Sequence, residues 1–215
     1  MSRVSTKPAE PYESGGRSDQ KKRTRAALVA SARALVAQGR TPSVGAAADA
    51  ASVSRATAYR YFPNQRLLLI AAHPETAART MLGEHPSQDP AERLDEVVRA
   101  FTALIVDTEP QQRTMLRLSL DPDVRSREAL PLRQGRAIAW ISEALEPVRD
   151  ELTDRGVHRL TLTIRSAIGI EALVWLTDIG GLTRAEAVES MRWSAQALLQ
   201  AALRSGAPGG RRRGR

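Results

Sequence analysis

The sequence predicts an all-α protein of about nine helices, because helix signals recur along most of its 215 residues and strand signals are almost absent. Apolar residues return at helical spacing, capping residues precede the periodic segments, and glycines or an Asp-Pro pair follow them. These marks predict helices over residues 19–38, 43–50, 54–60, 64–82, 90–107, 110–120, 131–149, 156–179 and 183–204. The flanking residues 1–18 and 206–215 are rich in Ser, Gly, Pro and charge, and we expect them to be disordered.

The first four expected helices follow one another closely. An apolar stripe from Leu28 to Val36 defines the helix at 19–38, and Gly39 ends it. The next three helices are marked by N-cap residues, which are Ser43, Ser54 and Asn64.

Proline and glycine mark the remaining boundaries. Pro74 falls inside the expected helix at 64–82 and predicts a kink or break near residues 71–73, which we interpret as a hinge. Capping sequences open two later helices, at Asp89-Pro90-Ala91-Glu92 and Thr183-Arg184-Ala185-Glu186. Helix ends are indicated by Gly83, Asp121-Pro122 and Gly180-Gly181.

Composition restricts the class of protein. Hydrophobic residues make up 42% and charged residues 26%, as in a soluble globular chain, and no apolar run reaches the ~18 residues of a membrane span. Cysteine is absent, which excludes disulfides, thiolate metal sites and cysteine nucleophiles. The histidines, His73, His85 and His158, lack metal-ligand spacing, so we expect no metal and no cofactor. The polar first 20 residues lack the apolar stretch of a signal peptide, which predicts a cytoplasmic protein.

The net charge of +8 is unevenly distributed along the chain. Residues 1–72 carry 12 basic and 4 acidic side chains, whereas residues 73–205 carry 16 and 20. This asymmetry indicates two modules, of which the first faces a polyanion.

The basic third of the chain contains the layout of a helix-turn-helix, over about residues 43–62. Small apolar residues suit the crossing of its two short helices, and these are Ala47, Ala48, Ala51 and Val53. In the second helix Ala58 and Phe62 are spaced to point inward. Its outer face offers donors for bases and phosphates from Arg55, Thr57, Tyr59, Arg60 and Tyr61. The motif predicts binding to double-stranded DNA, and the alternative is a solvated helix with incidental arginines.

The segment from Ala50 to Asn64, Ala-Ala-Ser-Val-Ser-Arg-Ala-Thr-Ala-Tyr-Arg-Tyr-Phe-Pro-Asn, resembles the signature of the TetR (tetracycline-repressor-like) family of bacterial transcriptional regulators. The resemblance extends from about Gln20 to Ala72, a third of the chain. It implies a three-helix DNA-binding domain over residues 19–72 and a helical effector-binding and dimerisation domain over residues 73–205. It also implies a homodimer on a palindromic operator, released by a small-molecule effector.

The resemblance implies roles for individual residues. Ser43 takes the place of a threonine that caps the first motif helix and contacts a phosphate in the family, and Tyr59 and Tyr61 match an aromatic pair. Base-facing positions are occupied by Arg55, Ala56, Thr57 and Arg60. The expected DNA-contacting set is Lys21, Lys22, Arg23, Arg25, Ser43, Ser54, Arg55, Ala56, Thr57, Tyr59, Arg60, Tyr61, Gln65 and Arg66.

Three positions depart from the family pattern. Ser52 replaces the usual turn glycine, at a cost of about 1 kcal/mol if that residue is left-handed. Ala47 replaces a larger aliphatic residue in the motif core. Gln65 stands where a phosphate-binding Lys or Arg is common, so this contact is either lost or taken over by Arg66.

The basic segment before the motif has two interpretations. Lys21 to Arg25 can lie along the phosphate backbone, as flexible basic arms do, or simply form a solvated helix start. The same two interpretations apply to Arg17.

The second module offers weaker signals. Residues 156–179 are apolar around most of the helix, which requires burial on all sides. The last helix carries a stripe suited to a dimer interface or, alternatively, to an internal core, formed by Val188, Met191, Ala195, Leu198 and Ala202. An effector pocket or core packing is the expected role of Met115, Trp140, Arg165 and Trp175, and Arg165 requires an anionic partner if it is buried.

The leading interpretation is a DNA-binding transcriptional repressor that an effector releases. An architectural DNA-binding protein without an effector is the second. A helical enzyme is the third, and no phosphate loop, dinucleotide glycine pattern, Gly-x-Ser-x-Gly or His-Glu-x-x-His motif supports it, so we expect no catalytic residues.

Overall fold

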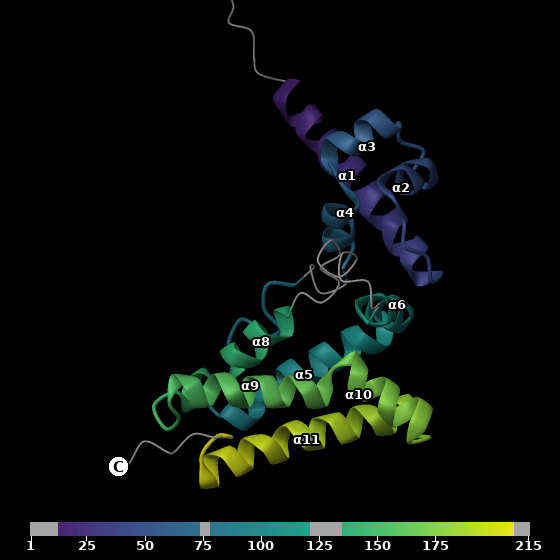
Figure 1. The fold of residues 1–215 in the computed structure, drawn as a ribbon. Coiled ribbons are helices and arrows are strands. Elements are labelled where there is room, and N and C mark those ends of the chain that lie inside the picture. The colour runs from purple at the N-terminus through teal and green to yellow at the C-terminus, as the bar shows by residue number, and fades with distance from the viewer. Residues whose placement is uncertain (1–12, 74–77, 121–134, 209–215) are drawn as a thin grey trace, which may run out of the picture.

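The computed structural model describes residues 13–73, 78–120 and 135–208. Over these residues the chain is helical and contains no strand, as predicted. Helices α1 to α4 form one unit, and the helices from α5 onward form a second, larger one (Figure 1). The two units meet where α6 packs on α1 (Figure 1).

The first unit consists of α1 (Glu13–Ala37), α2 (Val44–Ala50), α3 (Arg55–Tyr61) and α4 (Gln65–Ala72). The predicted N-caps are confirmed, because the side chains of Ser43, Ser54 and Asn64 each accept a backbone N–H of the following turn. Gly39 ends α1 in a left-handed conformation, at φ 79°. The core of the unit contains Leu28, Val29, Ala32, Val44, Ala47, Ala48, Ala58, Phe62, Leu68 and Ala72.

The expected disorder of residues 1–18 and 206–215 is wrong where these segments are described. Helix α1 already begins at Glu13, because each residue added to an existing helix gains a hydrogen bond at little cost. At the other end Ala207 is buried in the core of the second unit, and Arg159 donates to the carbonyl of Pro208. Residues 1–12 and 209–215 lie outside the described part of the chain.

The expected helix at 64–82 is wrong beyond Ala72, while the break predicted near residues 71–73 is confirmed. Its C-cap, His73, has an extended backbone (φ −61°, ψ 131°), the conformation that a following proline favours. Residues 78–89 are irregular and pack on the second unit, where Leu82 is buried and the carbonyl of Arg79 accepts the indole N–H of Trp140. Gly83 therefore does not end a helix, and Pro74 to Ala77 lie outside the described residues.

The second unit begins with α5 (Pro90–Asp107), α6 (Glu109–Ser119) and α8 (Arg136–Ala144), and a 3-10 turn follows at Glu146–Val148. Helix α9 (Asp154–Ile168), α10 (Ile170–Val174), a π turn (Trp175–Ile179) and α11 (Arg184–Ser205) complete it. The capping box at Thr183 and Glu186 is confirmed. Helix α11 packs along α9 and α5 (Figure 1), so the core lies among these three helices and α8.

Two long helices predicted in the second unit are interrupted. The expected helix at 156–179 breaks at Gly169, whose missing Cβ leaves room for the guanidinium of Arg165 and the carboxylate of Glu171. The expected helix at 131–149 ends at Ala144, because Pro147 lacks an N–H and crowds the carbonyl of Glu143. Residues 121–134, with the predicted Asp121-Pro122 stop, are not described.

One described stretch, Asp154–Ile179, is long and apolar enough to cross a membrane by length and composition alone. It packs against α8 and α11, and residues such as Leu160, Ile164 and Leu173 belong to the core of the second unit. Part of the stretch therefore belongs to the core of the second unit, while Leu162, Trp175 and Ile179 are exposed.

Candidate nucleic-acid interface

Helices α2 and α3 form the predicted helix-turn-helix. Ala47 and Ala48 are fully buried where the helices cross, so the small side chain at position 47 permits close packing. In the turn, Ser52 adopts φ 53°, which makes it the single non-glycine residue with positive φ in the described part of the chain. The backbone N–H of Val53 donates to Ala48 at 2.9 Å and closes the turn. The positive-φ turn that a glycine usually provides in the family pattern is therefore formed here by a serine.

Helix α3 presents the face that the sequence predicts. Ala58 is buried and Phe62, just after the helix, anchors it in the core. Arg55, Ala56, Tyr59 and Arg60 are exposed, while Thr57 and Tyr61 are half-buried. Thr57 is also held locally, because its hydroxyl lies 2.9 Å from that of Ser54.

Arg55 is paired within the motif, a contact that sequence reasoning missed. Its guanidinium donates to both carboxylate oxygens of Asp49 on α2, at 2.8 and 3.3 Å. This hydrogen bonding lowers the pKa of Asp49. The pair directs Arg55 toward α2, although both side chains remain largely exposed to solvent.

Arg60 has a different environment. It is exposed, it has no carboxylate partner among the described residues, and its guanidinium lies 5.9 Å from the ring centre of Tyr61. Among the cations of α3, Arg60 is therefore the one with free hydrogen-bonding capacity for bases or phosphates.

The basic residues of α1 lie beside the motif. Lys21, Lys22, Arg23 and Arg25 are exposed, and Lys22 makes a long ion pair of 3.9 Å with Asp19. The guanidinium of Arg25 lies over the ring of Phe62, 5.4 Å from its centre. This contact holds a cation of α1 close to the end of α3.

Gln65 and Arg66 have separate roles in the structure. The side-chain amide of Gln65 donates to the carbonyls of Pro42, at 3.0 Å, and Thr41, at 3.4 Å. Gln65 therefore ties the start of α4 to the loop before α2. Arg66 is exposed, so it is the residue available to an external phosphate.

The four expected pocket residues are not brought into one site. Trp140 packs edge-on against Phe101, with ring centres 5.9 Å apart, and Arg165 lies over the same ring and pairs with Glu171. Glu171 is thus the anionic partner that Arg165 requires. Met115 instead contacts the first unit in a small cluster with Val36 and Leu69, and Trp175 is 63% exposed.

The stripe expected at a dimer interface is largely internal. Met191, Ala195 and Ala202 are buried against other helices of the same chain, so their assignment to the interface is wrong, while Val188 and Leu198 are half-buried against the same core. The spacing of these residues follows the intrachain contacts of α11 with α9 and α5. The exposed apolar side chains of this region are instead Leu162, Trp175, Ile179 and Trp193.

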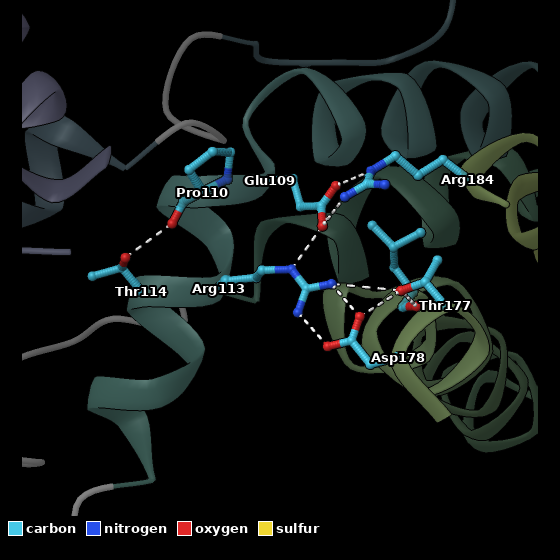
Figure 2. A network of polar contacts seen from close by, with 8 residues as sticks. Glu109, Pro110, Arg113, Thr114, Thr177, Asp178 and Arg184 are labelled. Carbon is cyan, nitrogen blue, oxygen red and sulfur yellow. Dashed lines mark hydrogen bonds and ion pairs between the residues drawn. The ribbon is translucent and has the colours of Figure 1, made fainter. Parts of the chain in front are cut away.

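A polar network that sequence reasoning missed joins α6 to the π turn and α11. Figure 2 shows the nearly buried carboxylate of Glu109 between the guanidinium groups of Arg113 and Arg184. Arg113 also forms a double contact with Asp178, at 2.6 and 2.7 Å. The hydrogen bonds from Arg184 and Arg113 lower the pKa of Glu109, and Arg113 and Thr177 lower that of Asp178 to about 2. The i, i+4 spacing of Glu109 and Arg113 was the available sequence signal.

Within the described ranges no group of three or more His, Asp or Glu side chains is placed to hold a metal ion. His73 is buried at the end of α4, whereas His85 and His158 are exposed.

Comparison by sequence gives no match to a family model and none to a curated protein. By structure, the chain is similar to a crystal structure of a TetR transcriptional regulator from Rhodococcus sp. RHA1. The similarity covers 84% of this chain and 98% of that one, with a TM-score of 0.54 and 20% sequence identity. The predicted all-α, TetR-like fold is therefore confirmed: a unit of four helices that contains a helix-turn-helix is followed by a larger helical unit.

Proposed function

We propose that the protein is a TetR-family transcriptional regulator that binds a specific DNA operator through α3. The observation that carries the proposal is the exposed face of α3, where Tyr59 and Arg60 project from a helix anchored by Ala58 and Phe62. A short helix of this kind fits the major groove, and an arginine there can bind guanine through two hydrogen bonds. The TetR-like fold supports this use of the motif.

The phosphate contacts proposed for this complex surround α3. Lys21, Lys22 and Arg23 on α1 and Arg66 on α4 are exposed cations at both sides of the motif. Ser43 contributes through the N-terminus of α2, where free N–H groups attract a phosphate. We assign Arg55 and Gln65 to positioning, since both side chains are engaged within the first unit.

The protein is proposed to act in the cytoplasm as a homodimer on a palindromic operator. Exposed large apolar side chains occur on α9, the π turn and α11, and a second copy would cover such side chains. A dimer of this kind would place its two α3 helices about 34 to 36 Å apart, or a multiple of that. We also propose that the dimer represses transcription while it is bound to the operator, and that a small molecule releases it from the DNA.

Selection of operator sequences from random duplexes tests the function. Arg60→Ala should lower affinity for the selected operator by about 1 to 3 kcal/mol and relax the preference at a few base pairs. The matched control is Arg99→Ala, because Arg99 is an exposed cation of the second unit. Equal binding by the Arg60 and Arg99 variants would contradict the placement of α3 on DNA.

The salt dependence of binding distinguishes a regulator from an architectural DNA-binding protein. Lys22→Ala should weaken binding to all duplexes alike and reduce the salt slope by about one unit. A regulator should retain a preference of roughly 10³ for its operator over random DNA, whereas an architectural protein should not.

A further inference from the structure

A hollow of about 390 Å³ lies at the junction of the two units. Its walls come from α1, from the end of α3 and from α4 on one side and from the first residue of α8 on the other. It is lined by Arg25, Tyr61, Phe62, Leu67, Ile70, Ala71 and Arg136.

The described lining of this junction hollow is positively charged. Arg25 and Arg136 both line it, and none of its described lining residues is a carboxylate. The Nε of Arg136 is shielded from solvent and has no hydrogen-bond partner. A shielded guanidinium nitrogen without an acceptor is costly, so Arg136 keeps unused hydrogen-bonding capacity at this junction.

The backbone at the same place also favours an anion. Arg136 is the first residue of α8, and the N-cap residue of this helix is Gly135, which has no side chain to cap it. The partial positive charge of the helix N-terminus therefore adds to that of the two arginines.

Apolar side chains form part of the remaining wall, beside Tyr61. Phe62, Leu67 and Ile70 line the hollow, and Leu67 is 44% exposed. A second hollow of about 600 Å³ shares Arg25 and Ala71 and is lined along α1 by Ala26, Val29 and Ala30, with Lys22 and Arg33 at its cationic side. Arg25 and Ala71 thus line both hollows.

We propose that the junction hollow binds a small amphipathic anion, a carboxylate or phosphate on an apolar body. Arg25 and Arg136 hold its charged group from the two units, and the apolar walls hold its body. A DNA backbone phosphate shares the charge but not the apolar body, and Arg136 lies on the second unit rather than on the motif.

Binding is tested without DNA, by calorimetric titration with octanoate. Octanoate should bind with one site per chain, while octanamide, which has the same body without the charge, and acetate, which has the charge without the body, should bind at least ten-fold more weakly. Equal heats for octanoate and octanamide, or no saturable binding of octanoate, would overturn the proposal.

Variants locate the site. Arg136→Gln and Arg25→Gln should each weaken octanoate binding about ten-fold, the loss of one charge-assisted hydrogen bond, and Arg99→Gln should not. Helical circular dichroism and the melting temperature establish that each variant is folded, and the two variants act on different helices. Unchanged octanoate affinity in both folded variants would overturn the site. If octanoate does not bind the native chain and Arg136→Gln lowers DNA affinity, Arg136 serves DNA binding and the site is also overturned.

The consequence for DNA rests on the proposed function. Arg25 is one of the expected DNA contacts, so saturating octanoate should lower operator affinity in the native protein and have little effect in Arg136→Gln. Because the titration contains no DNA, a protein that binds octanoate but no operator would contradict the proposed function and leave the junction site supported.

Discussion

Ser52 shows how much a single residue matters in the turn of the motif. With φ at 53°, its Cβ approaches the following carbonyl, a conformation that costs an L residue about 1 kcal/mol. The turn retains this conformation because Val53 is hydrogen-bonded to Ala48 and the helices on both sides pack through Ala47. The packing of α2 against α3 therefore offsets local strain.

Ser52→Gly should stabilise the protein by about 0.5 to 1 kcal/mol, because glycine adopts positive φ without the Cβ contact. Urea unfolding measures the change. Ser52→Ala is the control, since it removes the hydroxyl and keeps the strain, and it should give no gain. A glycine variant no more stable than the alanine variant would show that the turn is unstrained.

Residues governed by local rules could be predicted, and residues with distant partners could not. The caps at Ser43, Ser54 and Asn64 depend on the next turn of the chain alone. The pairing of Arg55 with Asp49 and of Gln65 with Pro42 requires two helices to be placed in space, so sequence reasoning gave both side chains to DNA. Helical periodicity correctly placed Arg55, Tyr59 and Arg60 on the exposed face of α3, while Thr57 and Tyr61 are half-buried.

Helix boundaries were predictable wherever a capping or helix-ending sequence is compatible with a single backbone conformation. Helix α5 begins at Pro90 after Asp89 and ends at Asp107, as expected. The break at Gly169 was not predicted, because the apolar periodicity continues across it and only the placement of Arg165 and Glu171 reveals its cause. The apolar stripe of α11 was assigned to a partner because period does not distinguish an intrachain from an interchain core.

Glu109 is the centre of the polar network that holds α6 against α11. Its pKa is lowered, so its ionised form is favoured by folding: this stability is fully present above the ordinary glutamate pKa and is lost as pH falls through the lowered value. Glu109→Gln should lower the free energy of unfolding by about 2 to 3 kcal/mol at pH 7. The difference in unfolding free energy between the variant and the native protein should shrink below about pH 4.5. Urea unfolding at several pH values measures this.

The control for this prediction is Glu84→Gln, since Glu84 is exposed and outside the network. Its stability should follow that of the native chain at every pH. A gap between native and Glu109→Gln proteins that stays constant down to pH 3 would mean that the carboxylate charge of Glu109 contributes nothing.

Trp193 is the most exposed large apolar side chain of α11, at 74%, on the face opposite the buried Met191 and Ala195. If this face meets a second copy, Trp193→Glu should yield folded monomers, because a charge would be buried in the interface. Sedimentation at micromolar concentration measures the mass. Ala139→Glu, at an exposed position of α8, should leave the dimer intact. A Trp193→Glu protein that remains dimeric would show that the dimer interface does not include this face of α11.

Among the described residues, a small apolar cluster and a hydrogen bond join the two units. Val36, Leu69 and Met115 form a separate apolar cluster between α1, α4 and α6, and Arg117 donates to the carbonyl of Gly39 at 2.9 Å. Each unit has a larger core of its own. A small displacement of α6 can therefore displace α1 without repacking either core. Conformational coupling between the two units requires such a contact.

Met115→Ala should weaken this coupling specifically. Removing the side chain leaves a cavity between the units and costs about 2 to 4 kcal/mol, so the two units should unfold in more separated steps than in the native protein. Differential scanning calorimetry measures the width and number of transitions. Met191→Ala removes a methionine of the same size from the core of the second unit, and it should lower that unit's melting temperature while the first unit still melts at its native temperature. If Met115→Ala lowers stability but leaves one sharp transition, the units are joined by more than this cluster.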